Sequence, residues 1–147
     1  MRALVQRVSE ASVSVDNAVV SHIQGGLLVL LGIKSDDTQK DQDYIIKKIL
    51  NLRIFSDQKN MMNKSVVDVS GEILLVSQFT LYGDCSKGNR PSFAKAMKPE
   101  QAKILYDDFA RNVKQQYGKV REGIFAAHMQ VSLVNDGPVT ILIDSKK

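Results

Sequence analysis

The chain has 147 residues, 44% of them hydrophobic, which suits one domain with one core. Its 20 Lys and Arg against 16 Asp and Glu give a net charge of +4, which favours anionic partners but only permits RNA binding. Cys85 is the only cysteine, which excludes an intramolecular disulfide and a disulfide-stapled secreted scaffold. The alternating N-terminus lacks the apolar stretch of a signal peptide, and no apolar run is long enough to span a bilayer. We therefore expect a single cytoplasmic domain over residues 1–147.

Short strands are expected along much of the chain. Apolar residues recur at alternate positions from Leu4 to Ile23, with a turn at Asp16-Asn17, which predicts an antiparallel meander. The run Leu27–Leu31 predicts a strand buried on both faces and lying in the middle of the sheet. Another buried strand is expected over residues 72–76. Strand-like patterning returns from Gly123 to Ile143, broken by a turn just before Val139.

Two helices are expected. The first covers about residues 38–51, where Thr38 and Asp41 form a weak capping box. The second starts with Pro99 in its first turn and ends at Gly118. The side chains expected to face the core are Tyr44, Ile45, Ile49 and Leu52 in the first helix, and Ala102, Leu105, Phe109 and Val113 in the second. These elements predict a mixed α/β fold, an antiparallel-rich curved sheet or barrel-like β-structure with two main helices.

The common catalytic motifs are missing from the sequence. His22 and His128 are the only histidines, and neither has a carboxylate or cysteine at metal-ligand spacing, so we expect no metal site. No G-x-S-x-G elbow is present, and nothing around Cys85 resembles a cysteine-protease signature. The glycines form neither a dinucleotide fingerprint nor a P-loop, so we expect no cofactor. An enzyme of this composition must act on a substrate that is already activated.

Two segments change this interpretation: Ser77-Gln78-Phe79-Thr80 after the buried strand, and Asn135-Asp136-Gly137-Pro138-Val139-Thr140 near the C-terminus. Taken alone, the first is an ordinary strand end and the second an ordinary turn. They occur together with ALVQRV from Ala3, GLLVLLG from Gly26, RIFSD from Arg53 and RPSF from Arg90. In this order and spacing, nearly the whole chain resembles the D-aminoacyl-tRNA deacylase family.

The resemblance implies an enzyme that hydrolyses the ester between a D-amino acid and tRNA. In that family, the segment matching Ser77, Gln78 and Thr80 lines the pocket for the aminoacylated adenosine. Gly137-Pro138 would have a cis peptide bond and enter the partner subunit's pocket as a chirality filter, which implies a homodimer with active sites at the interface. A filter that only excludes L-residues should also admit glycyl-tRNA.

The mechanism leaves alternatives open. Thr80 has no evident base, so we favour a route in which the terminal ribose 2′-hydroxyl assists water, Gln78 and Thr80 orient the ester, and backbone N–H groups near Phe79 and Thr80 stabilise the oxyanion. A nucleophilic Thr80 is the alternative. Arg7 either supports the pocket from the first strand or is an ordinary polar strand residue.

The basic loop after Thr80 and the overall function also have two interpretations each. Lys87, Arg90 and Lys95 either contact tRNA phosphates or belong to a solvated loop, and Phe93 is expected to anchor that loop rather than stack on a base. The competing function is a non-catalytic nucleic-acid-binding protein. A general small-ester hydrolase is a third possibility, but it lacks a nucleophile–base pair.

Overall fold

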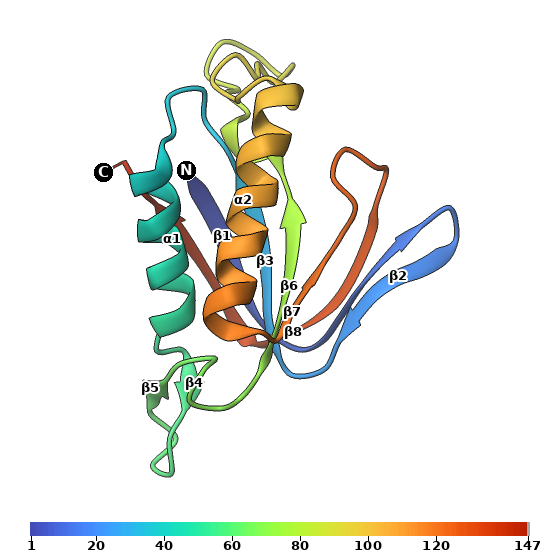
Figure 1. Cartoon of the computed structure of the whole chain (residues 1–147). Coiled ribbons are helices and arrows are strands. Elements are labelled where there is room, and N and C mark those ends of the chain that lie inside the picture. Colours follow the sequence, from blue (N-terminus) through green and yellow to red (C-terminus); the bar gives the residue numbers. More distant parts are fainter. Residues whose placement is uncertain (147) are drawn as a thin grey trace.

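A long first strand organises the sheet. In the computed structural model, which describes residues 1–146, β1 (Arg2–Val15) pairs along one edge with β8 (Gln130–Asp144). Its other edge pairs first with β3 (Gly26–Gly32) and then with β2 (Ala18–Ile23), and all three pairings are antiparallel. Because two strands follow one another along a single edge, the sheet curves strongly, as Figure 1 shows.

Two parallel strands complete the sheet beyond β3. β6 (Glu72–Ser77) runs parallel to β3, and β7 (Val120–Glu122) runs parallel to β6. Parallel neighbours need a crossover connection, and the two helices, α1 (Gln39–Asn51) and α2 (Pro99–Tyr117), lie in these connections on the same face of the sheet (Figure 1). The predicted mixed α/β fold with a curved sheet and two main helices is confirmed.

A small hairpin lies apart from this sheet, at the end of α1. It consists of β4 (Phe55–Ser56) and β5 (Met62–Lys64). The loop between them is held by Asp57, which accepts backbone N–H groups from Lys59 at 2.7 Å and Met61 at 3.0 Å. Among residues 1–146, no helix is long and apolar enough to cross a membrane.

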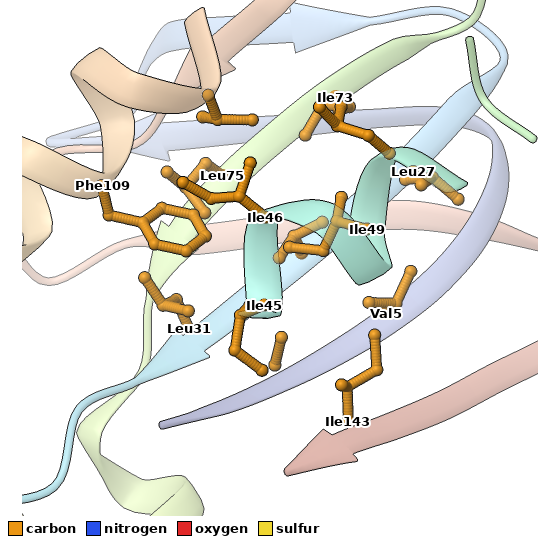
Figure 2. Packing of buried hydrophobic residues seen from close by; sticks show 14 of the residues in the cluster. Val5, Leu27, Leu31, Ile45, Ile46, Ile49, Ile73, Leu75, Phe109 and Ile143 are labelled. Atoms are coloured by element: carbon orange, nitrogen blue, oxygen red, sulfur yellow. The ribbon is translucent and has the colours of Figure 1, made fainter. Parts of the chain in front are cut away.

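The sheet buries apolar side chains on both faces. Leu27, Val29 and Leu31 of β3 face the helices, whereas Leu28 faces the opposite core. The helix-covered cluster, part of which is drawn in Figure 2, includes Val5, Leu27, Leu31, Ile45, Ile46, Ile49, Ile73, Leu75, Phe109 and Ile143. The second cluster consists of Val8, Ala11, Val13, Ile23, Leu28, Leu74 and Val76. The predicted double burial of Leu27–Leu31 is therefore confirmed.

Local signals at the ends of elements were read correctly. The α1 N-cap is Thr38, whose N–H donates to Asp41 Oδ2 at 2.8 Å in the expected capping box. Gly118 ends α2 with φ of 80°, a conformation that favours glycine. Asp16 and Asn17 form the β1–β2 turn, and both have positive φ, as a type I′ turn requires.

One prediction of burial was wrong. Tyr44 is 42% exposed, because α1 directs Ile45, Ile46 and Ile49 inward, and the Tyr44 ring lies instead beside the Lys48 ammonium. Leu4 is only half-buried, whereas Val5 is fully buried. Irregular pairing between Gln6 and Glu10 reverses which alternate residues of β1 face which core, and a simple period of two cannot anticipate that change.

Candidate functional site

The first segment of the candidate site lies at the exposed end of β6. Ser77 pairs with Leu31 of β3, and Gln78 N–H donates to Leu31 O at 2.7 Å. The chain then turns into a short 3₁₀ helix, η1 (Phe79–Tyr82), whose first helical bond runs from Leu81 N–H to Gln78 O at 3.3 Å. The N–H groups of Phe79 and Thr80 precede that bond, so no carbonyl of the helix accepts them.

The side chains of this segment are accessible to a ligand. Phe79 and Thr80 are exposed, and Ser77 and Gln78 are half-buried. Gln78 Nε2 donates to the Thr80 hydroxyl oxygen, so the hydroxyl proton of Thr80 remains available to another acceptor. The Phe79 ring meets Phe93 edge to face, with 5.0 Å between the ring centroids, which ties the following loop to η1 as expected of a loop anchor.

Arg2 connects η1 to the start of β1 and to the end of β8. Arg2 Nη1 donates to Leu81 O at 3.0 Å, and Arg2 Nε donates to Asp144 Oδ2 at 2.8 Å. The same guanidinium lies 4.8 Å from the centre of the Tyr82 ring. The hydrogen bond to Asp144 raises the pKa of Arg2, and burial raises the pKa of Tyr82, so the first stays charged and the second stays neutral.

The second segment is a bulge inside β8, not the predicted turn between two strands. Thr140 pairs with Gln6 and Asn135 pairs with Val8, so residues 136–139 lie opposite a single residue of β1. Within this bulge, the Gly137-Pro138 peptide bond is cis. The pairing partners on β1 continue on both sides, which is why a turn signal in the sequence does not end the strand.

Arg7 holds the bulge in place. Its Nε donates to Asp136 O at 3.1 Å and lies 3.2 Å from Asp136 Oδ2, while its Nη1 donates to Ile54 O at 2.6 Å. Gly137 has φ of 129°, and a Cβ there would lie 3.0 Å from Arg7 Nη2 and 2.8 Å from Val139 Cγ2. A side chain at this position would be strained, and Arg7 supports the bulge rather than the β6 end.

The two segments lie at different levels of the sheet within one chain. Gly32, which follows the Leu31 partner of Ser77, pairs with Arg2, whereas the bulge lies opposite Arg7. Arg7 is five steps along β1 from Arg2, which corresponds to about 17 Å at the rise of a strand. A single chain therefore does not bring the two segments into one pocket.

The basic loop residues are dispersed. Lys87, Arg90 and Lys95 are all exposed, and Lys95 Nζ pairs with Asp84 Oδ2 at 3.1 Å. Hydrogen bonds from Ser86, and then from Lys95, hold the pKa of Asp84 below its usual range. Of the three, only Lys95 lines a hollow of about 330 Å³, which we call the basic hollow. Its lining residues are Arg2, Lys34, Tyr82, Lys95, Asp144 and Lys146.

Sequence reasoning missed most of this hollow. Arg2, Lys34, Tyr82 and Lys146 come from distant parts of the chain, and no local motif signals their proximity. The hollow forms because backbone bonds join the loop after β3 to the loop after η1, for example from Met97 N–H to Ile33 O at 3.0 Å.

The two histidines and the cysteine take no part in the contacts described above. His22, His128 and Cys85 are exposed, and His22 lies in β2. Within residues 1–146, no group of three or more His, Cys, Asp or Glu side chains is placed to hold a metal ion. The groups that the candidate site presents are backbone N–H groups, an amide and hydroxyls.

Comparison with known proteins identifies the family. The sequence profile described as D-Tyr-tRNA(Tyr) deacylase matches residues 4–144. The chain belongs to that family. A D-aminoacyl-tRNA deacylase of Clostridioides difficile is 57% identical to this deacylase over 147 residues, and one of Thermosipho africanus is 56% identical. Both alignments cover 100% of this chain and 99% of the relative. The predicted family and enzyme class, a D-aminoacyl-tRNA deacylase, are confirmed.

Solved structures show the same fold. The chain matches the solved structure of a c-Myc DNA Unwinding Element Binding Protein with a TM-score of 0.94 and 47% identity, covering 98% of both chains. A probable eukaryotic D-amino acid tRNA deacylase matches with a TM-score of 0.84 over 97% of both chains, and its 20% identity supports the fold alone.

Proposed function

We propose that this chain hydrolyses the ester bond that joins a D-amino acid to the 3′ end of a tRNA, releasing free D-amino acid and tRNA. The observation that carries the proposal is the full Ser77-Gln78-Phe79-Thr80 segment, which lies at the accessible end of β6 in a chain more than half identical to named D-aminoacyl-tRNA deacylases. Because the proposed substrate is an aminoacyl-tRNA, we expect the enzyme in the cytoplasm.

The reaction needs only modest catalytic help. An aminoacyl ester beside a vicinal hydroxyl and a protonated amine is already activated towards water. Water adds to the carbonyl carbon, the tetrahedral intermediate collapses, and the ribose 3′-oxygen leaves with a proton. The N–H groups of Phe79 and Thr80 are the proposed donors to the developing oxyanion, and losing one such donor typically costs about 100-fold or more in rate.

Thr80 is proposed to orient the ester rather than to attack it. Its hydroxyl oxygen accepts from the Gln78 amide, and an amide is not a base that can take a proton from threonine. The Thr80 proton can instead be donated to the substrate. The terminal ribose 2′-hydroxyl, which the substrate itself brings, is the proposed group that positions the attacking water.

Chiral selection is assigned to the backbone at Gly137-Pro138. Rigid backbone placed against one side of the substrate α-carbon leaves room for hydrogen but excludes the side chain of an L-residue. D-side chains then point into solvent, so many are accepted. Glycine has no side chain to exclude, and glycyl-tRNA is therefore a proposed substrate. The three contacts of Arg7 keep this backbone in position.

The proposed enzyme is a homodimer with each active site at the interface. Because the two segments lie about 17 Å apart along β1 in one chain, the Gly137 bulge must come from a partner to reach the β6 end. β8 is suited to this interface, since it pairs only with β1 among the described strands. It also exposes apolar side chains, namely Val134 at 49%, Ile141 at 37% and Leu142 at 51%.

The first experiment compares hydrolysis of D-tyrosyl-, L-tyrosyl- and glycyl-tRNA by the purified protein, with EDTA present and an enzyme-free blank. D-selective release, with glycine also released, is expected. Equal cleavage of both tyrosyl esters would refute the chirality filter. A relative is named for binding a DNA element, so salt-dependent nucleic-acid binding without ester turnover would favour the non-catalytic alternative.

The shared site is tested with mixed dimers. Chains carrying Gln78→Ala and chains carrying Gly137→Ala should each form homodimers of low activity. A purified mixed dimer contains one site with both segments intact, so it should regain about half of the wild-type activity. A mixed dimer no more active than either homodimer would show that each site is built within one chain.

A further inference from the structure

We propose that the basic hollow binds a phosphodiester group of the single-stranded 3′ end of the RNA. This subsite rests on the proposed function, because it would hold the nucleotides that precede the reacting one. The hollow opens beside η1, whose last residue, Tyr82, lines it. The exposed Phe79 and Thr80 come a few residues before Tyr82 in the same helix. At the rise of a 3₁₀ helix, Thr80 and Tyr82 are about 4 Å apart along the axis.

A buried hydroxyl without a partner points to a ligand. Tyr82 is 4% exposed, and its hydroxyl oxygen is fully buried with no hydrogen-bond partner among residues 1–146. Buried polar groups are nearly always hydrogen-bonded, so an acceptor from outside the chain is the expected partner. The phenol is neutral, because burial raises its pKa, and it can therefore donate a hydrogen bond to a phosphate oxygen.

The lining charges favour an anion of modest affinity. The hollow is lined by one carboxylate, Asp144, and by four basic side chains, Arg2, Lys34, Lys95 and Lys146. Lys34 Nζ lies 3.3 Å from Asp36 and Lys95 Nζ lies 3.1 Å from Asp84, both outside the lining. Lys146 Nζ lies 3.1 Å from Asp36, 3.7 Å from the buried Asp37 and 4.0 Å from Asp41. Exposed ion pairs contribute little to stability, so an arriving phosphate can share the ammonium protons of Lys34 and Lys95 at little cost.

The same aspartates make the hollow selective for tethered RNA. They offset much of the positive charge, so free inorganic phosphate should bind weakly. A phosphodiester attached to an aminoacylated end that already occupies the η1 segment arrives at high effective concentration. Arg2 links the two places, because its Nη1 donates to Leu81 O while its side chain lines the hollow.

The decisive variant is Tyr82→Phe, which removes only the partnerless hydroxyl. Removing an unsatisfied buried group should leave the melting temperature equal or higher, so loss of folding does not confuse the test. KM for D-tyrosyl-tRNA should rise about 10–100-fold, the effect of one hydrogen bond to a charged acceptor. KM for 3′-D-tyrosyl-adenosine, which has no phosphate, should rise much less. Tyr44→Phe on the exposed face of α1 is the matched control, and it should change neither.

Lysine variants provide a second test of the subsite, by RNA binding instead of catalysis. Lys146→Gln should weaken binding of a fluorescent ACCA tetranucleotide, measured by anisotropy, by about 3–10-fold at low salt, whereas Lys47→Gln on α1 should not. This arm requires no turnover. Equal binding by wild type, Tyr82→Phe and Lys146→Gln would overturn the subsite even in an active enzyme. The wild type could instead bind the RNA more tightly than the two variants and yet hydrolyse no ester. That result would uphold the subsite and refute the proposed function.

Discussion

Gly137 is the position at which the proposed chirality filter is most sensitive to a single methyl group. In Gly137→Ala, the new Cβ would lie 2.8 Å from Val139 Cγ2 and 3.0 Å from Arg7 Nη2, both closer than ordinary contact. The backbone also has φ of 129°, which side chains of L-residues rarely adopt. Backbone strain of this kind costs about 1–3 kcal/mol, and the bulge can relieve it only by moving.

The expected result is a loss of both rate and selectivity. A displacement approaching 1 Å at a positioning group can cost about 100-fold, so kcat/KM for D-tyrosyl-tRNA should fall about 10–100-fold, and the ratio of D to L hydrolysis should fall with it. Gly118→Ala is the matched control, because Gly118 also has positive φ, at 80°, but nothing lies within 4 Å of its added Cβ. That variant should lose stability, by about 1 kcal/mol, and keep its activity.

The assay is single-turnover hydrolysis of the D- and L-tyrosyl esters, with melting temperatures measured on the same preparations. Each kcal/mol corresponds to about 2–4 °C in a chain of this size, so the loss of stability can be separated from the loss of rate. Wild-type rate and selectivity in a folded Gly137→Ala enzyme would refute the assignment of chiral selection to this bulge.

Two further predictions concern the η1 segment and acid stability. Gln78→Ala should lower kcat more than Thr80→Val, which should keep measurable turnover; a trapped aminoacyl-enzyme, lost in Thr80→Val, would establish threonine as a nucleophile instead. Burial raises the pKa of Asp41, but hydrogen bonds from Ser145 and Thr38 outweigh it and lower the pKa to about 2. This contribution to stability is complete above about pH 4 and disappears as pH falls towards 2. The melting temperatures of wild type and Asp41→Asn should therefore converge in that interval, and a constant difference would contradict the assignment.

Local sequence signals predicted the parts of the fold that depend on neighbouring residues. The capping box at Thr38, the helix end at Gly118 and the turn at Asp16-Asn17 each follow from backbone preferences of a few residues. Tyr44 was misplaced because its exposure depends on which stripe of α1 meets the sheet. The continuous β8 was missed because β1, far away in sequence, supplies pairing partners on both sides of Gly137.

In the candidate site too, contiguous residues could be predicted from the sequence, whereas their arrangement in space could not. Ser77 to Thr80 and Gly137-Pro138 were found as contiguous residues, but only strand register shows that they lie about 17 Å apart along β1 within one chain. Tyr82 could be recognised only in the structure, because a hydroxyl without a partner is a property of the packed state.

The register of β1 links the two segments physically. Arg2 and Arg7 lie on the same strand, and each donates to a backbone carbonyl, of Leu81 in η1 and of Asp136 in the bulge. The separation of the segments is therefore set by the rise of one strand, which is far stiffer than a loop. A rigid separation is what a two-fold dimer needs, since every shift of the bulge relative to η1 would be repeated at both sites. Arg2 and Arg7 thus fix the distance between η1 and the bulge for the proposed interface, which two motifs on a single flexible loop could not do.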